Sequence, residues 1–492
     1  MSVRKAIAWA SASKLLSFSI AFAGSIIVAR YFLTPAEVGL FSIAFAATAL
    51  IAVLQEFGLN RYIVGEAELG KEKLHTAFSV SLAVAWGVAL VILAAAKPLS
   101  WLYGDPKLFP LMLVIGSSYL FVPLAIVPTA LRQRAMDFRS DFMIEVAASV
   151  TNAVVTISLA AAGQGPMALA WGALAQQIAR ALVSQWRNGW IFPWPLRFTG
   201  ASHVLRFGGG STLLQIFDSV GTRSPDLIVG GIAGNTAVGL YSRASGLAVQ
   251  LVNLMTGAVN SVFYPALAQM RNEGKSLGEP YLRLVGGYTG IVWPALAGLA
   301  AASYPLVHAL YGPRWTDVAP ILSLLAIAEM IFVALPMSVQ VPILLGRLDG
   351  VLKRTGTATA VAVVLLLVGA RHGGQAAAAA YVVYAAFWFC LYAVFLRSLT
   401  GFAWRGLLAD YGRSLIGAAA AVAPLLAWYR WITPPTAMGF AELLVPVSAG
   451  VLLWLAALFA TSNHLTDDIR RLVVTTLDRI GLRRPASKQP LP

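Results

Sequence analysis

The chain has 492 residues, of which 58% are hydrophobic and only 12% are charged, and its mean hydropathy is +0.74. A soluble domain carries about 25% charged residues, so this composition excludes a water-soluble globule. The net charge of +15 suggests nucleic-acid binding, but the Lys and Arg residues cluster beside apolar segments, where they meet anionic lipid headgroups. We therefore expect no nucleic-acid partner. The single Cys390 excludes a disulfide framework and a cysteine-based metal site.

Apolar segments long enough to cross a bilayer recur along the whole chain. A hydrocarbon core needs about 20 apolar residues per helix. Segments that meet this requirement lie near 11–32, 38–56, 74–96, 108–130, 141–162, 166–186, 207–232, 237–263, 281–308, 317–344, 355–370, 375–397, 407–429 and 440–461. The pattern predicts an all-α polytopic membrane protein with about fourteen transmembrane helices.

The connectors between these segments alternate in positive charge. Short loops rich in Lys and Arg favour the cytoplasmic side. Most of the 36 Lys and Arg residues lie at the termini and in even-numbered connectors, such as 131–139. One missed or additional helix would place every later basic connector on the opposite side of the membrane. The unbroken alternation therefore supports fourteen spans with both termini in the cytoplasm.

The chain also repeats itself. Val38–Ser42 returns as Val238–Ser242 at an offset of 200, and Leu102–Gly104 matches Leu310–Gly312. The matches stay in order and fall at equivalent helix positions. The duplicated unit spans six helices, so both copies run the same way across the membrane, which is a plan that secondary transporters use.

The repeat predicts the domain organisation. We expect two six-helix bundles related by a parallel repeat, followed by two extra C-terminal helices. The predicted parts are an N-terminal bundle, a cytoplasmic linker, a C-terminal bundle, two added transmembrane helices and a cytoplasmic tail, at 1–190, 191–206, 207–400, 401–462 and 463–492. The tail should begin as an amphipathic helix and end disordered, because its last residues have little apolar surface to bury.

Three stretches carry a family resemblance: 29–39, 131–139, and 207–230 with 239–244. They resemble Wzx-type oligosaccharide flippases, in the polysaccharide-synthesis branch of the multidrug/oligosaccharidyl-lipid/polysaccharide (MOP) exporter superfamily. The resemblance implies a V-shaped pair of bundles around a central cavity. It also implies an alternating-access flippase in the bacterial inner membrane that translocates an undecaprenyl-diphosphate-linked oligosaccharide for exopolysaccharide, capsule or O-antigen synthesis. The implied partners are that lipid, the membrane lipids, and the polysaccharide polymerase with its chain-length machinery.

Basic residues inside the spans are the first candidate site. A charge near a helix centre costs about 2.5–3.5 kcal/mol on insertion scales, so it needs a reason. Arginine binds phosphate oxygens in pairs, which suits a diphosphate headgroup. The predicted cationic, substrate-binding residues are Arg180, Arg223, Arg243, Arg30 and Lys14. Two structural explanations stay open: Arg180 and Lys14 lie close enough to the cytoplasmic side to reach the headgroups, and Arg223 can pair with Asp226.

Acidic residues inside the spans are the second candidate site. Asp218, Asp226 and Glu329 are the candidates for binding a coupling H⁺ or Na⁺. Asp218 and Glu329 have no basic residue one helical turn away, and Pro225 kinks the segment beside Asp218. We expect no other cofactor and no metal site.

Three alternative functions stay open. Two belong to the same superfamily: a flippase for the peptidoglycan lipid precursor, and a MATE-like drug/cation antiporter. The third is a membrane polysaccharide polymerase, which the short outer connectors disfavour. The sequence has no P-loop, so it also disfavours ATP hydrolysis, and we expect the protein not to be an enzyme.

Overall fold

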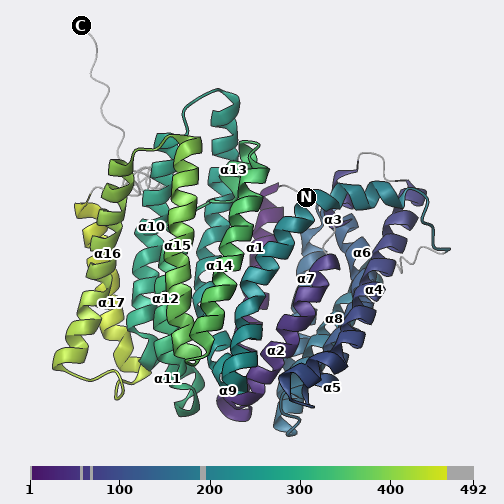
Figure 1. Cartoon of the computed structure of the whole chain (residues 1–492), viewed down its shortest axis with the longest axis horizontal. Coiled ribbons are helices and arrows are strands. Elements are labelled where there is room, and N and C mark those ends of the chain that lie inside the picture. Colours follow the sequence, from purple (N-terminus) through teal and green to yellow (C-terminus); the bar gives the residue numbers. More distant parts are fainter. Residues whose placement is uncertain (1–2, 56–58, 67–69, 189–194, 462–492) are drawn as a thin grey trace, which may run out of the picture. The chain divides into compact units, whose positions relative to one another are not determined.

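The computed structural model describes residues 3–55, 59–66, 70–188 and 195–461. Within these ranges all regular structure is helical, as Figure 1 shows. The predicted tail at 463–492 and the residues 191–194 of the predicted linker lie outside the described residues. The helices are α1 (Val3–Ile27), α2 (Pro35–Ala52), α3 (Leu59–Gly65), α4 (Lys71–Tyr103), α5 (Leu108–Ser118), α6 (Val122–Arg134), α7 (Phe138–Ala161), α8 (Met167–Asn188), α9 (Ala201–Asn272), α10 (Gly278–Ala301), α11 (Ser303–Tyr311), α12 (Val318–Phe332), α13 (Gln340–Leu344), α14 (Leu348–Ala370), α15 (Gly374–Thr400), α16 (Trp404–Trp431) and α17 (Phe440–Ala460).

The helices account for the fourteen predicted spans. In the part of the chain that the structure describes, nine helical stretches are long and apolar enough to cross a membrane. One of them, Leu108–Arg134, joins α5 and α6. The remaining spans are α8, the two parts of α9, α12 and α16, which match predicted segments in position. The prediction of an all-α polytopic membrane protein is confirmed.

Helix α9 comprises two spans joined without a loop. It runs over 72 residues, but Gly234 has φ 87° and ψ 174°, which is not helical. A side chain is strained at such a positive φ, whereas glycine adopts it freely. Gly234 therefore ends the first span and starts the second, at the predicted outer connector 233–236.

Polar residues in the short connectors cap the helices. The Thr34 hydroxyl accepts a hydrogen bond from the Glu37 N–H, and the Glu37 carboxylate accepts one from the Thr34 N–H, so a capping box starts α2. Asp137 caps α7 by accepting from the Ser140 N–H at 3.3 Å. The hydrogen bond with Ser140 and the nearby Arg187 lower the pKa of Asp137. These caps satisfy backbone donors that the helices cannot pair themselves.

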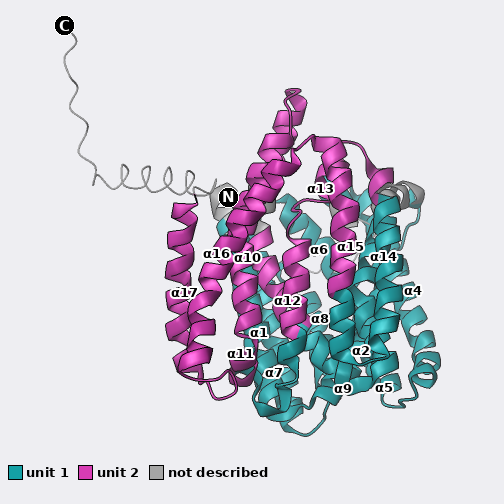
Figure 2. Cartoon of the chain, turned by 60° about the vertical axis from the view of Figure 1, so that its left-hand side comes forward, with its two compact units in different colours: residues 1–244, 310–321, 352–381 teal, residues 245–309, 322–351, 382–492 magenta. Residues whose placement is uncertain are grey.

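The chain divides into two compact units, coloured in Figure 2. Unit 1 comprises Met1–Ala244, Leu310–Ile321 and Leu352–Tyr381, and unit 2 comprises Ser245–Ala309, Leu322–Val351 and Val382–Pro492. Residues 207–244, which the sequence assigns to the second bundle, group with unit 1 in this division. The predicted domain boundaries come from the sequence repeat, whereas the two units are defined by contacts within the folded chain. The predicted boundaries therefore stay a prediction.

Inside unit 1 the two copies of the repeated motif pack against each other. A Cβ atom on Gly39 would overlap the carbonyl oxygen of Asn235, and one on Gly239 would overlap that of Pro35. These contacts are reciprocal at the offset of 200, and the Ser42 and Ser242 hydroxyls lie 2.9 Å apart on the same interface. Such reciprocity is what a twofold relation between α2 and the second part of α9 produces. The contact supports the predicted repeat.

In unit 2, α16 packs along α10. The Thr289 and Ser414 hydroxyls lie 2.8 Å apart, and the rings of Trp293 and Tyr411 stack with centroids 5.2 Å apart. The Trp454 indole of α17 donates to the Gly290 carbonyl at 2.9 Å. The last two helices, which lie outside the sequence repeat, are therefore attached to α10 by buried polar contacts as well as apolar ones.

Gly39→Ala tests the close contact inside unit 1. The new methyl group would overlap backbone atoms, which cannot move away as a flexible side chain can. We therefore expect the free energy of unfolding to fall by at least about 1–3 kcal/mol. The matched control is Gly87→Ala in α4, where a Cβ would meet nothing within 4 Å. We expect the control to match or exceed the parent protein, because alanine favours a helix. Thermal unfolding in detergent measures both variants, and equal midpoints would refute the close contact.

Reporter fusions test the topology. We expect fusions after Gly165, Gly234 and Gly373 to report the periplasm, and fusions after Arg139, Lys275 and Arg405 to report the cytoplasm. The reason is the distribution of Lys and Arg over the connectors. A consistent reversal beyond one fusion point would mean that a span before that point is miscounted.

Candidate functional site

All five basic candidates lie in unit 1, where the structure gathers them into three groups. Arg30 and Arg243 meet at the segment 310–315. Arg223 lies on the first part of α9. Arg180 and Lys14 lie near Glu145 of α7. Of the acidic candidates, Asp218 and Asp226 belong to unit 1 and Glu329 belongs to unit 2.

Arg30 and Arg243 both contact the segment 310–315, which comprises the last residues of α11 and those just after it. Nη1 of Arg30 donates to the Leu310 carbonyl at 3.5 Å. The guanidinium of Arg243 lies 5.9 Å from the ring centre of Tyr311 and 5.8 Å from that of Trp315. Trp315 is fully buried and donates from its indole N–H to the Ala29 carbonyl at 2.9 Å. The structure therefore brings together two arginines that lie more than 200 positions apart in the sequence.

Aromatic rings, rather than acids, accommodate the charge of Arg243. In the described part of the chain Arg243 makes no ion pair, and its Nε atom is buried without a hydrogen-bond partner. A cation over aromatic faces gains about 0.5–2 kcal/mol or more, depending on its exposure to water. The rings stabilise the charge in part and leave the Nε–H donor without a partner. Arg243 can thus bind an anion without first breaking an ion pair.

Arg223 lies between two acids of its own helix. Its guanidinium lies 5.2 Å from the ring centre of Phe45 of α2 and interacts electrostatically with both Asp218 and Asp226. The structure shows no contact ion pair of Arg223 with any described residue. Asp218 is therefore less isolated than its sequence spacing indicates, and the close Arg223–Asp226 pair that the sequence left open is not formed in this structure.

Arg180 forms the ion pair that sequence spacing could not reveal. Its Nε and Nη2 atoms donate to the two carboxylate oxygens of Glu145 at 3.0 and 2.9 Å, and Nη1 donates to Gln177 at 2.6 Å. Arg180 comes from α8 and Glu145 from α7, and both are partly exposed. This paired, two-oxygen geometry neutralises Arg180, so it is the least available of the arginines for a ligand.

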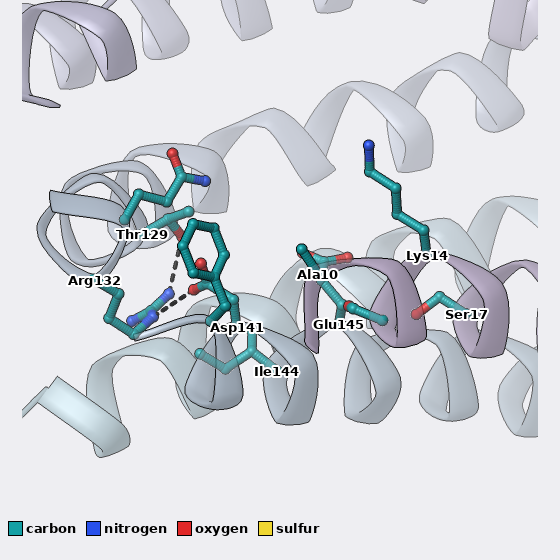
Figure 3. Close-up of a pocket in the computed structure, with 11 residues that line it drawn as sticks. Ala10, Lys14, Ser17, Thr129, Arg132, Asp141, Ile144 and Glu145 are labelled. Atoms are coloured by element: carbon teal, nitrogen blue, oxygen red, sulfur yellow. Dashed lines mark hydrogen bonds and ion pairs between the residues drawn. The ribbon is translucent and has the colours of Figure 1, made fainter. Parts of the chain in front are cut away.

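Lys14 lines a pocket between α1, α6 and α7, drawn in Figure 3. The pocket has a volume of about 380 Å³. Arg132 lines it too, and the dashed lines in Figure 3 mark bonds of Arg132 that include its Nε donation to Asp141 at 2.6 Å. Glu145 is the remaining charged residue of the lining. Its carboxylate pairs with Arg180, which itself does not line the pocket.

Glu329 lies in α12 beside a tyrosine of α10. It interacts electrostatically with Tyr288, whose hydroxyl lies 2.6 Å from that of Thr256. No ion pair to Glu329 is present in the described ranges. Those ranges also contain no group of three or more His, Cys, Asp or Glu side chains that could hold a metal ion.

Comparisons with known proteins place these observations in a family. A model of the family described as polysaccharide biosynthesis protein matches residues 27–320, which is more than half of the chain and includes Arg30, Arg180, Arg223 and Arg243. The succinoglycan biosynthesis transport protein ExoT of Rhizobium meliloti (strain 1021) is 27% identical over 439 residues, covering 86% of this chain and 84% of that protein. The lipopolysaccharide biosynthesis protein WzxC of Escherichia coli (strain K12) is 25% identical over 329 residues, covering 66% of each chain.

Solved structures share the fold. The lipid II flippase MurJ, in an inward closed conformation, superposes with a TM-score of 0.72 at 15% identity, covering 95% of this chain and all of that one. A multidrug resistance MATE family transporter of the MOP superfamily, in an inward-facing conformation, gives a TM-score of 0.59 at 17% identity over 78% of this chain and 98% of that one. At these identities the likeness establishes the fold alone. The family match to more than half of the sequence goes further: this chain belongs to the polysaccharide biosynthesis protein family.

Proposed function

We propose that this protein is a flippase that moves an undecaprenyl-diphosphate-linked oligosaccharide across the bacterial inner membrane for exopolysaccharide, capsule or O-antigen synthesis. The observation that carries the proposal is the family match, together with a relative named as a succinoglycan biosynthesis transport protein over most of both chains. The protein acts as a transporter and not as an enzyme. Both of its termini face the cytoplasm, and a polysaccharide polymerase with its chain-length machinery uses the product on the outer face.

The arginines in unit 1 suit such a substrate. A diphosphate carries its charge through the membrane and needs cationic donors that no acid already occupies. Arg243 and Arg223 meet this requirement, because each lies over an aromatic ring and makes no contact ion pair with a described residue. Guanidinium groups bind phosphate oxygens with two parallel hydrogen bonds, which fixes orientation as well as charge.

The repeat contact suits alternating access. The Gly39–Gly239 contact joins the two repeat copies near the predicted outer ends of α2 and of the second part of α9. In the proposed transport cycle this contact opens and closes. Small residues permit backbones to approach closely and to separate without leaving large side chains unpacked.

Deletion of the gene tests the function directly. We expect lipid-linked oligosaccharide to accumulate on the cytoplasmic face, because its proposed carrier is removed. Labelling of the sugars in inside-out and right-side-out vesicles measures the distribution. A lipid II assay in the same vesicles provides the comparison. Unchanged oligosaccharide distribution with impaired lipid II transport would replace the proposal with the peptidoglycan alternative.

A cysteine pair tests the closing contact. In a Cys390→Ser background, Ser42→Cys with Ser242→Cys should form a disulfide, because the two hydroxyl oxygens lie 2.9 Å apart. Oxidation should stop transport, and reduction should restore it. Each single cysteine variant is the control. Full transport by the oxidised pair would show that the contact does not need to open.

Arginine substitutions test the cationic site. We expect Arg243→Ala to abolish transport with the protein still present in the membrane, and Arg223→Ala to reduce it at least about tenfold, the effect of about 1.4 kcal/mol. Arg243→Lys should rescue only in part, because lysine cannot bind two oxygens at once. Arg371→Ala is the control, since Arg371 is exposed in a predicted outer connector. Full transport activity of both alanine variants would show that Arg243 and Arg223 do not bind the substrate.

Acid substitutions test ion coupling, with H⁺ or Na⁺ as the proposed ion. Asp218 is the first carrier that we propose; Asp226 and Glu329 are the alternatives. We expect Asp218→Asn to stop gradient-driven transport in vesicles while binding of the lipid persists, because the amide mimics the protonated acid. Glu329→Gln and Asp226→Asn test the alternatives, and Asp317→Asn, at an exposed position, is the control. If all three site variants keep gradient-dependent transport, coupling does not involve these carboxylates.

A further inference from the structure

The pocket beside Lys14 has a lining that the transport proposal does not use. Its α1 wall consists of Ala10, Ser13, Lys14 and Ser17. The spacing i, i+3, i+4 and i+7 places these residues on one face of the helix. Three of the four are small, and this leaves a hollow of about 380 Å³ between α1, α6 and α7. The polar face of a membrane helix thus opens into a space instead of packing against a neighbour.

The acids in the pocket are already neutralised. Arg132, only 4% exposed, donates from Nε to Asp141 at 2.6 Å. Arg180, which lies outside the lining, holds both oxygens of Glu145. Lys14 is therefore the one lining charge that no ion pair compensates among the residues that the structure describes. The electrostatic balance of the pocket favours an anion.

Hydroxyl donors accompany that charge. The Ser17 Oγ atom is buried and has no hydrogen-bond partner in the described structure. Thr129 Oγ1 accepts from Arg132 Nη2 at 3.0 Å, which leaves its own O–H free to donate. A buried polar group without a partner costs about 1–3 kcal/mol, and a ligand oxygen would remove that cost.

The surroundings of the pocket are apolar. Ala10 of α1 and Phe138 and Ile144 of α7 line the pocket beside its polar residues. The Trp9 and Phe142 rings meet edge to face, with centroids 5.1 Å apart, and join the two helices near the pocket. A ligand here would have its anionic group among polar donors and apolar side chains beside it.

We propose that this pocket binds the phosphate-bearing headgroup of a membrane lipid, with the Lys14 ammonium and the Ser17 hydroxyl as donors and the first part of the acyl or prenyl chain against Ala10, Phe138 and Ile144. Lys14 lies one turn inside the cytoplasmic end of the predicted span 11–32, from where its long side chain can reach the lipid headgroups. The lipid is either a bulk anionic phospholipid or a polyprenyl diphosphate. Binding of a bulk phospholipid here does not depend on the flippase function, whereas binding of the polyprenyl diphosphate rests on it.

Lipid binding by the purified full-length protein tests the proposal. The probes are phosphatidylglycerol, phosphatidylcholine, undecaprenyl diphosphate and inorganic phosphate, measured by native mass spectrometry and by the lipid-dependent shift of the unfolding temperature. We expect Lys14→Gln to weaken binding of the anionic lipids about tenfold, the effect of losing one charge-assisted hydrogen bond. Lys14→Arg should keep the binding. Lys107→Gln is the control, because Lys107 is exposed at the start of α5.

A second variant separates binding from folding. Ser17→Leu keeps the charge of Lys14 but fills the hollow, so we expect it to lower affinity for the same lipids without lowering the unfolding temperature of the lipid-free protein. Tighter binding of undecaprenyl diphosphate than of phosphatidylglycerol would support the transported lipid, and equal binding would support a bulk phospholipid. Inorganic phosphate that binds as tightly as the lipids would overturn the lipid assignment. Unchanged lipid binding by both Lys14→Gln and Ser17→Leu would overturn the site.

Discussion

The backbone contact between Gly39 and Gly239 is the constraint on which the arrangement of unit 1 depends. In a bilayer the hydrophobic effect does not drive helices together, because lipid tails are as apolar as leucine. Close packing and polar contacts must provide the attraction. With no side chain at either position, the carbonyls of Asn235 and Pro35 reach the opposite glycine, and the Ser42 and Ser242 hydroxyls can then meet. Any larger residue would separate the helices and remove these contacts.

The arginines of unit 1 are accommodated in two different ways, and this difference decides which of them are already paired with an acid. Arg132 and Arg180 pair with acids of a neighbouring helix, so their charge is neutralised at short range. Arg223 and Arg243 lie over aromatic rings, which attract a cation, and neither makes an ion pair with a described residue. An anionic substrate competes with a carboxylate in the first case and only with weak contacts in the second. The two arginines over rings are thus the ones suited to transient binding.

The sequence predicts what local patterns determine. Span length and the alternation of basic connectors predict fourteen helices, and order-preserving matches predict the repeat, because both depend on neighbouring residues along the chain. The pair of Arg180 with Glu145 could not be predicted, since it depends on how α7 and α8 are rotated against each other. The meeting of Arg243 with Tyr311 and Trp315 depends on folding across a long stretch of chain. The pocket at Lys14 could not be predicted either, because residues of three different helices line it.

The repeat also explains how a symmetric scaffold acquires a charged site. Arg243 stands at the position that Ile43 occupies in the first copy, again at an offset of 200. Ile43 is fully buried, and its side chain lies where a Cβ of Gly230 would be, so it serves packing. Tyr103 and Tyr311 are likewise equivalent: the Tyr103 hydroxyl donates to the Leu227 carbonyl at 3.0 Å, whereas the Tyr311 ring lies against Arg243. One copy uses these positions to hold helices together, and the other uses them to place a cation. The glycines and serines that join the copies stay the same, because the contact between them requires the same small residues on both sides.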